Sequence, residues 1–312
     1  MIKISYKTGL GLDFIAAGLT DVGLLREVNE DSYSILPGHK LFLVADGMGG
    51  HKAGDIASQL ATTTIASFFR ETDSGADQTW PFHFDPHRST DENRLLTSVK
   101  LANRRIFDAS VRSREVQGMG TTVVGALFEK RTGRLYVAHV GDSRAYRFRD
   151  GQLAQITKDH SLLNDYLSVM PFMTEEQRAE LPSNVITRAL GMQETVEVDV
   201  CQESPLPGDI YLLCSDGLSG MVTDEEMATH IERQGSDPEA LVKTLVELAN
   251  RAGGEDNITV VIVAFAGEPG DVEVEADTDA ALKIARLEEA KTLVPDEEPT
   301  GRSPDQPTLA DD

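Results

Sequence analysis

The chain is poor in cysteine and has no long apolar run. Cys201 and Cys214 are its only cysteines, too few for a disulfide framework and without the paired spacing of a zinc site, which favours a reducing compartment. No run of about 18 apolar residues occurs, and residues 1–13 lack the apolar stretch of a signal peptide. We therefore expect a cytoplasmic protein that does not associate with membranes.

Basic residues are also scarce. The 312 residues include 29 Lys and Arg against 52 Asp and Glu, a formal net charge of −23. This balance argues against nucleic acid and anionic membranes as partners, because their phosphates repel an acidic surface. A phosphorylated substrate is not excluded, since a bound divalent cation can dominate the local charge of an acidic site.

Residues 267–312 differ in composition from the rest of the chain. They contain 14 acidic and 4 basic residues, are rich in proline and have no aromatic residue. Such a segment buries too little apolar surface to offset the entropy lost on ordering. We predict one domain over residues 1–266 and a disordered tail over 267–312, with one helix near 280–291 as the exception.

Apolar, β-branched runs bounded by turn residues predict strands. Residues 130–133 and Asp150-Gly151 favour hairpin turns, so the centre of the chain should form an antiparallel meander. The stretches 72–91 and 159–184 should be surface excursions. The predicted strands are 41–45, 121–128, 134–140, 145–148, 210–214 and 258–265.

Apolar residues at helical spacing and capping patterns predict helices between these strands. Thr223 and Glu226 form a capping-box pattern, and Asp237 with Pro238 is typical of a helix start. Helices interspersed with antiparallel strands indicate an α+β fold of layered sheets and helices. The predicted helices are 53–69, 92–110, one from Thr223 to Ile231, and one from Asp237 that ends before Gly253.

Carboxylates stand at the ends of several predicted strands. Strands 41–45 and 210–214 run into Asp46 and Asp216, and Asp256 precedes a third strand. Strand ends can converge on one point, where clustered carboxylates need a compensating charge. Hard divalent cations with oxygen ligands supply it. Alone, each Asp-Gly is more often a turn than a ligand, so only the set indicates a metal site.

The carboxylates belong to longer motifs. Asp-x-Gly-x-x-Arg-x-x-Asn-Glu-Asp spans residues 21–31 and Asp-Gly-Met-Gly-Gly-His spans 46–51, and further pieces follow at 118–122, 141–144, 215–217 and 256–257. In kind and order they resemble the bacterial form of the PPM (PP2C-type) serine/threonine protein phosphatases, over residues 14–266. The resemblance implies an α+β fold, a four-layer α-β-β-α sandwich of two mainly antiparallel sheets flanked by helices, with a binuclear metal site at one end.

Position by position, the resemblance assigns the metal ligands. Asp46 would bridge two ions, Mn²⁺ or Mg²⁺, and the Gly47 carbonyl would bind one of them, because glycine permits close backbone approach. Asp216 and Asp256 would bind the other ion. Glu30 would act directly or through water.

Four further residues receive roles in the same way. Asp142, with Asp216, would help to hold a weaker third cation, and a plain turn at a hairpin end is the alternative. Arg26 matches the phosphate-binding arginine of the family, and its planar fork suits two phosphate oxygens. Asn29 and Asp31 are assigned to a supporting shell that orients ligands and waters.

One position departs from the animal members of the family, which carry a histidine where Met48 stands. That histidine is their candidate for protonating the leaving group, and Met48 cannot donate a proton. His51 is equally well explained by local packing, so a water at the metal site is the expected acid. Residues 160–191 resemble the flap that borders the site, where part of the substrate preference should reside.

The implied activity is hydrolysis of phosphoserine and phosphothreonine in proteins by a water that two cations activate. Expected partners are phosphoproteins and a serine/threonine kinase that the enzyme opposes, and the protein should be a monomer. Thr308, with Asp311 three positions on, suggests that a phosphorylated tail engages a phosphothreonine-reading domain. A catalytically silent phosphoprotein-binding module on the same fold is the alternative, which loss of a metal carboxylate would favour, and none is lost.

Two other hydrolase classes do not fit the sequence. A cysteine phosphatase needs an arginine six positions after its cysteine, and Gly220 stands there after Cys214. The segment around Ser143 approaches a nucleophile elbow, but that motif requires a following helix, and residues 144–148 predict a strand.

Overall fold

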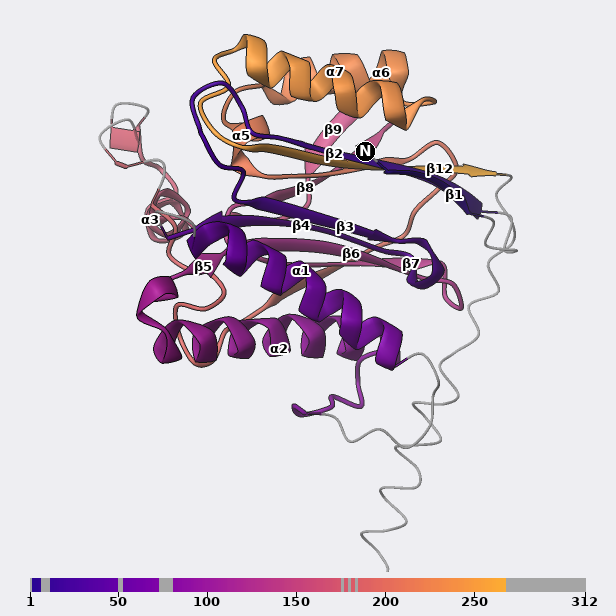
Figure 1. The fold of residues 1–312 in the computed structure, drawn as a ribbon. Coiled ribbons are helices and arrows are strands. Elements are labelled where there is room, and N and C mark those ends of the chain that lie inside the picture. Colours follow the sequence, from indigo (N-terminus) through magenta and orange to yellow (C-terminus); the bar gives the residue numbers. More distant parts are fainter. Residues whose placement is uncertain are drawn as a thin grey trace, which may run out of the picture.

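Two stacked antiparallel sheets with helices on their outer faces make up the protein (Figure 1). The fold is α+β, and the predicted four-layer sandwich is confirmed. The computed structural model describes residues 2–6, 12–49, 53–72, 81–174, 177–178, 181–182 and 185–267. The predicted tail with its helix near 280–291, Thr308 and His51 all lie outside the described residues.

The first sheet joins the beginning of the described chain to its end. Its order is β1 (Ile2–Tyr6), β2 (Leu12–Asp21), β12 (Ile258–Gly267), β11 (Ile210–Cys214), β8 (Arg144–Arg149) and β9 (Gln152–Gln155). The first residue of β12, Ile258, pairs with the last residue of β2, Asp21. This pairing brings the loop after β2 and the loop before β12 to the same end of these two neighbouring strands.

The second sheet has the order β10 (Asp199–Glu203), β7 (Arg134–Val140), β6 (Val123–Glu129), β4 (Leu41–Met48) and β3 (Asp31–Leu36), and β5 (Gly120–Thr121) also pairs with β4. Asp31 at the start of β3 is the Cα partner of Asp46 near the end of β4. Two carboxylates are therefore neighbours across this ladder.

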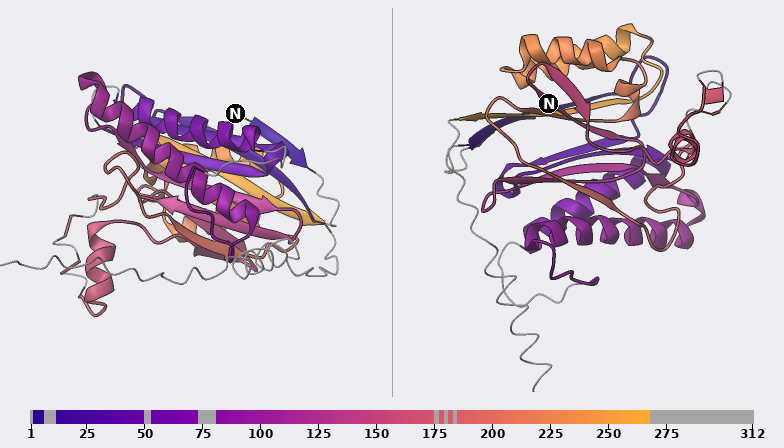
Figure 2. Two further views of the ribbon diagram at one scale, coloured as in Figure 1. Left: turned by 90° about the horizontal axis from the view of Figure 1, so that it is seen from below. Right: turned by 180° about the vertical axis from the view of Figure 1, so that it is seen from behind.

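Two pairs of helices cover the outer faces, as Figures 1 and 2 show. The helices α1 (Ala53–Glu71) and α2 (Thr90–Arg112) lie on the second sheet, and α6 (Asp224–Gln234) and α7 (Pro238–Arg251) lie on the first. The predicted capping box of α6 is confirmed, and Asp237 caps α7 with Pro238 in its first turn. Short elements are η1 (Pro37–His39), η2 (Arg114–Val116), α3 (Leu162–Val169) and α5 (Asp216–Ser219).

Apolar side chains fill three layers, one between the sheets and one under each helix pair. In β11, Tyr211 and Leu213 point between the sheets, whereas Leu212 points toward α6 and α7. Because both faces of the strand are covered, its sequence is apolar at every position, unlike the alternating pattern of a half-exposed strand. Full burial of each such side chain contributes about 1.5–3 kcal/mol.

The six predicted strands and four predicted helices are present, with ends shifted by a few residues. The predicted strand 121–128 is interrupted at Thr122, whose N–H donates to the Asp46 carbonyl. The predicted meander was wrong: β6 and β7 form a hairpin in the second sheet, and β8 and β9 form one in the first. The chain changes sheets at Gly141, where a φ of 107° permits the turn.

Candidate active site

The sequence-predicted site residues gather at one end of the sandwich. Asp46 lies near the end of β4, and Asp216 follows the end of β11. Asp142 lies in the link from β7 to β8, Asp256 lies just before β12, and Glu30 lies just before β3. Cys214 pairs with both Val260 and Arg144, which sets the ends of β11, β12 and β8 side by side. Antiparallel pairing, rather than proximity in sequence, assembles the site.

Backbone contacts fix the position of Asp46. Its N–H donates to Thr122 Oγ1 at 3.1 Å, and its carbonyl accepts from the Thr122 N–H at 2.8 Å. The Thr121 hydroxyl donates to the same carbonyl at 2.8 Å. The Asp46 side chain therefore projects from a backbone that two threonines hold in place.

The aspartate side chains act on one another electrostatically. Removal from bulk water, and then the charges of Asp31, Asp216, Asp142 and Asp256, raise the pKa of Asp46 well above its ordinary value. Burial, and then the charge of Asp256, raise the pKa of Asp216. Burial and neighbouring like charges both disfavour the ionised form of a carboxyl group, and a nearby cation would favour it.

Three of these aspartates carry an unsatisfied oxygen. The Oδ1 atoms of Asp31, Asp142 and Asp216 are buried and have no hydrogen-bond partner. Burial raises the pKa of Asp31 and that of Asp142 to about 7, and the charge of Asp216 adds to both shifts. A buried lone pair without a partner is costly, and carboxylate oxygens are the donors that suit an oxygen-coordinated cation.

Close backbone approach at Gly47 leaves no room for a side chain. Its N–H donates to the Glu30 carbonyl at 3.1 Å. A Cβ atom at Gly47 would lie 2.1 Å from the Gly54 carbonyl oxygen, and one at Gly54 would lie 2.7 Å from Glu30 Oε1. The two glycines therefore let the β4 terminus, the start of α1 and Glu30 meet at the carboxylates.

The loop of residues 22–30 is tied to the start of β12 by Asn257. The Asn257 Oδ1 accepts from the Glu30 N–H at 2.7 Å, and its Nδ2 donates to the Val22 and Val28 carbonyls at 3.0 Å each. Arg26 in this loop donates from Nη2 to Asp256 Oδ2 at 2.7 Å. The predicted phosphate-binding arginine and a predicted metal ligand thus form an ion pair.

Asp31 is more central than the sequence predicts. It was assigned to a supporting shell with Asn29, and Asn29 does support the loop by donating to Thr20 Oγ1 at 2.9 Å. Asp31, however, is buried among the other aspartates, and its Oδ2 accepts from the Ser215 hydroxyl at 2.7 Å. The sequence signal for this position is the register of β3 on β4, which the motif alone does not reveal.

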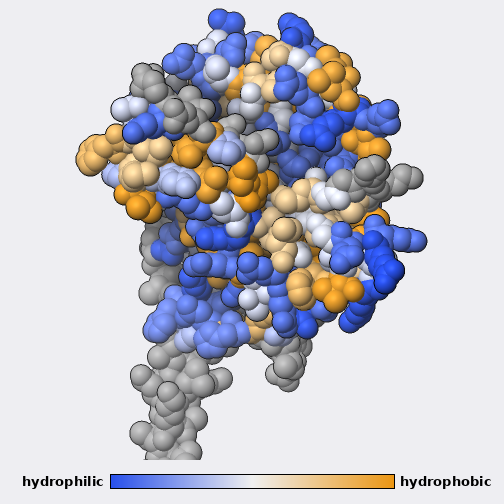
Figure 3. Space-filling model, turned by 90° about the vertical axis from the view of Figure 1, so that its left-hand side faces the viewer, coloured by the Kyte–Doolittle hydropathy of each residue, from blue (hydrophilic) through white to orange (hydrophobic). Residues whose placement is uncertain are grey.

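The flap region extends from the sandwich beside the site. Helix α3 protrudes from the body of the molecule (Figure 1), but the surface excursion predicted over 159–184 begins later than expected, because Asp159, His160 and Ser161 are buried. Val169 at the end of this helix and Phe172 just beyond it are 81% and 96% exposed. The face that carries the flap shows apolar and hydrophilic side chains interspersed (Figure 3). Among the described residues, no helix is long and apolar enough to cross a bilayer.

Comparisons with known proteins identify the family to which the chain belongs. A family model described as Protein phosphatase 2C matches residues 26–256. The serine/threonine phosphatase Stp of Listeria welshimeri is 34% identical over 251 residues, which are 78% of this chain and 93% of that protein. The serine/threonine protein phosphatase PstP of Mycobacterium tuberculosis is 37% identical over 248 residues, 79% of this chain and 44% of that protein.

A solved structure shows the same fold. The catalytic domain of PstP in complex with two manganese ions superposes with a TM-score of 0.67 at 35% identity, and the match covers 82% of this chain and 99% of that one. The chain belongs to the protein phosphatase 2C family.

Proposed function

We propose that Asp46, Asp216 and Asp256, together with the Gly47 carbonyl and Glu30, hold two divalent cations, Mn²⁺ or Mg²⁺, and that Arg26 binds the substrate phosphoryl group. The chain is a metal-dependent protein serine/threonine phosphatase that acts on phosphoproteins. The observation that supports the ligand assignment is that Asp46, Asp216 and Asp256 lie close enough for their charges to interact: besides burial, the charges of Asp216 and Asp256 raise the pKa of Asp46, while the buried Oδ1 of Asp216 has no partner.

The donor set suits hard cations. It consists of carboxylate and carbonyl oxygens, which are the ligands that Mg²⁺ and Mn²⁺ accept. It contains no thiolate or imidazole. When bound, the cations would lower the pKa of a water molecule and stabilise charge on the phosphoryl oxygens. Asp142, with Asp216, would contribute to a weaker third cation site.

The protein's own side chains position the substrate and the ligands. Arg26 is half-exposed, so its guanidinium is accessible to a phosphoprotein and can offer two parallel N–H donors to phosphoryl oxygens. The Ser215 hydroxyl holds Asp31, and Asn257 holds Glu30. Met48 has no titratable group, so we assign protonation of the leaving alkoxide to a water of the site.

The partners and the location follow from the same reasoning. We propose that the phosphatase opposes a serine/threonine kinase in the cytoplasm. Its two cysteines support a reducing compartment, because Cys201 and Cys214 are both unpaired. The monomeric state and the domain boundary at 266 stay predictions, as does engagement of a phosphothreonine-reading domain by the tail.

The proposed activity is tested by cation dependence. Hydrolysis of a phosphothreonine peptide should require added Mn²⁺ or Mg²⁺ and should be lost in excess EDTA. The variant Asp46→Asn should be inactive at all cation concentrations while remaining folded by circular dichroism. Asp209→Asn is the control, because Asp209 is a buried carboxylate that precedes β11 and is paired with Arg149. Full activity of the wild type in EDTA would refute the proposal. If both the wild type and a folded Asp46→Asn bind the phosphopeptide and neither hydrolyses it, a binding module is favoured.

A further inference from the structure

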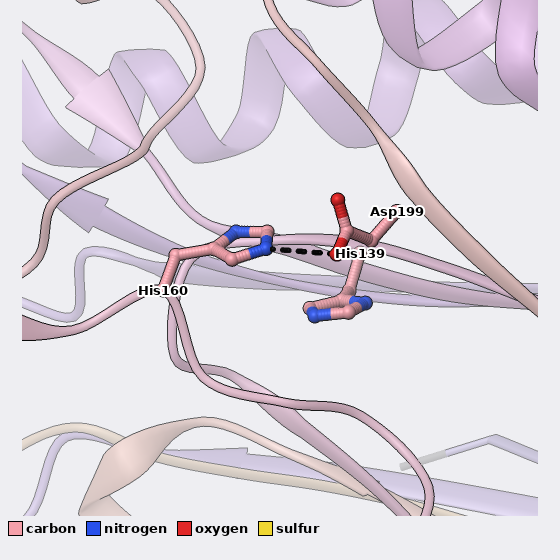
Figure 4. A group of neighbouring side chains, drawn as sticks. All are labelled: His139, His160 and Asp199. Carbon is pink, nitrogen blue, oxygen red and sulfur yellow. Dashed lines mark ion pairs between the residues drawn. The ribbon is translucent and has the colours of Figure 1, made fainter. Parts of the chain in front are cut away.

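A second cluster of potential ligands lies away from the aspartates. His139 on β7, His160 after β9 and Asp199 on β10 each offer a donor atom, and these atoms lie within 4.8 Å of one another. Figure 4 shows the two imidazole rings face to face and His160 directed toward Asp199. The ring centroids are 4.7 Å apart with an interplanar angle of 15°. Both histidines are buried.

Hydrogen bonding shows that His160 is already fully engaged. Its Nδ1 accepts from the Gly141 N–H at 3.0 Å, so the proton of the neutral ring resides on Nε2. Nε2 lies 3.4 Å from Asp199 Oδ2. The Arg188 guanidinium donates to the other Asp199 oxygen at 2.7 Å and lies 3.1 Å from Nε2. His160 therefore has no free lone pair, and the adjacent arginine cation disfavours a metal ion, although Nδ1 of His139 is buried without a partner.

His160 holds Gly141 at two points. Besides the bond to Nδ1, the His160 N–H donates to the Gly141 carbonyl at 2.9 Å. Gly141 is also confined from the other side, because a Cβ atom there would lie 2.6 Å from Thr122 Cβ. The turn that precedes Asp142 is therefore fixed between Thr122 and His160.

The residue that this turn presents is Asp142. Its Oδ1 is buried without a partner, and the charge of Asp216 acts on its side chain. Among the described residues, no hydrogen bond joins Asp142 to another side chain, so its position depends on the backbone of the turn. His160 is also tied to the flap, because its carbonyl accepts from the Thr187 N–H at 2.9 Å.

We propose that His160 is a positioning residue for Asp142, and that by clamping Gly141 it sets the affinity of the cation site to which Asp142 contributes. The inference rests on the proposed role of Asp142 in a weaker third site. The orientation of a ligand by a neighbouring hydrogen-bonded group accounts for about 10- to 100-fold in metal affinity. Asp199 and Arg188 orient the ring from the opposite side.

Two substitutions distinguish the role of Nδ1 of His160 from that of Nε2. His160→Asn can place its side-chain oxygen where Nδ1 lies and should retain the bond from Gly141. His160→Gln reaches instead toward Asp199 and loses that bond. Titration of the cation-free full chain with Mn²⁺ by calorimetry should show the weakest site weakened about 10- to 100-fold in His160→Gln and unchanged in His160→Asn. His139→Gln, which removes the stacked ring without touching Gly141, should give the wild-type isotherm.

Asp142→Ala separates failure of this inference from failure of the proposed site. It should remove the weakest Mn²⁺ site, and adding His160→Gln to it should change nothing further. If Asp142→Ala removes the site while His160→Gln leaves it intact, or if His139→Gln acts like His160→Gln, the positioning role is wrong. If Asp142→Ala leaves the isotherm unchanged, the proposed third site fails and the inference fails with it. An NMR measurement on the wild type is independent of variant folding: a His160 ring protonated on Nδ1 rather than Nε2 would also overturn the proposal.

Discussion

The aspartate cluster and the histidine cluster make opposite use of similar materials. His139, His160 and Asp199 are close enough for a metal ion by distance, but His160 and Asp199 are already hydrogen-bonded and the Arg188 cation lies beside them, which leaves the uncharged Nδ1 of His139 without a partner. The aspartates around Asp46 are less tightly spaced, yet several of their buried oxygens have no partner.

The difference shows which observation identifies a cation site. Proximity of potential ligands is common, because buried polar groups pair with one another. Neighbouring buried carboxylate oxygens without partners are rare, because each one costs free energy unless a cation offsets its charge. By this criterion the aspartate cluster, with three buried carboxylate oxygens without partners, is the cluster that we propose to hold cations.

The sharpest way to break the comparison is to exchange one carboxylate for its amide in each cluster. Asp216→Asn should lower kcat/KM for a phosphothreonine peptide by about a thousandfold, equivalent to about 4 kcal/mol of transition-state stabilisation. Asp199→Asn should retain activity within about tenfold, because Asp199 would influence the cations only indirectly, through His160 and Asp142. Equal losses in the two variants, measured at saturating Mn²⁺, would remove the distinction.

The pH dependence of stability should differ in sign between the clusters. The folded-state pKa of Asp31 and of Asp142 is about 7 against an ordinary 3.8, so the cation-free fold binds more protons than the unfolded chain. The contribution of these two aspartates to the free energy of unfolding is fully present below about pH 4 and is lost as the pH rises through about 7. Burial lowers the pKa of His139 and His160. The contribution of the two histidines to the free energy of unfolding is therefore fully present above their ordinary pKa of 6.5 and is lost as the pH falls.

Chemical denaturation of the cation-free chain between pH 5 and pH 8 measures the balance. Asp142→Asn should remove part of the loss of stability at high pH, by about 1–3 kcal/mol. Saturating Mn²⁺ should do the same in the wild type, because the ion compensates the carboxylates. A wild-type pH profile that neither Asp142→Asn nor Mn²⁺ changes would contradict the assigned electrostatics.

The two ends of β11 provide a matched pair of carboxylates. Asp209 precedes the strand and forms an ion pair with Arg149, and Asp216 follows it among other aspartates. In cation-free protein, Asp209→Asn should lower the free energy of unfolding by about 1–3 kcal/mol. Asp216→Asn should raise it by about 1 kcal/mol, because it relieves repulsion between carboxylates. Urea titrations give both values, and destabilisation by Asp216→Asn would show that repulsion there is negligible.

The smallest effect should come from Arg26. Its ion pair with Asp256 is half-exposed, so Arg26→Gln should change the free energy of unfolding by less than about 1 kcal/mol. The same variant should raise KM for a phosphopeptide about tenfold through loss of bidentate phosphate binding. Arg88→Gln is the control, since Arg88 pairs with Asp85 in a similarly exposed position. An unchanged KM in Arg26→Gln would remove the arginine from substrate binding.

Much of this organisation could be predicted from local patterns. The apolar runs 41–45 and 210–214 located the aspartates just beyond them, Asp46 and Asp216, and capping residues located α6 and α7. What could not be predicted depends on register between distant segments. The pairing of Asp31 with Asp46, which buries Asp31 in the cluster, is one case. The contact of His160 with Gly141 is another, because nothing in either segment indicates its partner.

Anomalous diffraction from crystals grown with Mn²⁺ tests the central claim most directly. The account predicts two strong manganese peaks among Asp46, Asp216 and Asp256, with a weaker third peak near Asp142, and no peak between His139 and His160. Manganese bound at the histidines, with none at the aspartates, would contradict it.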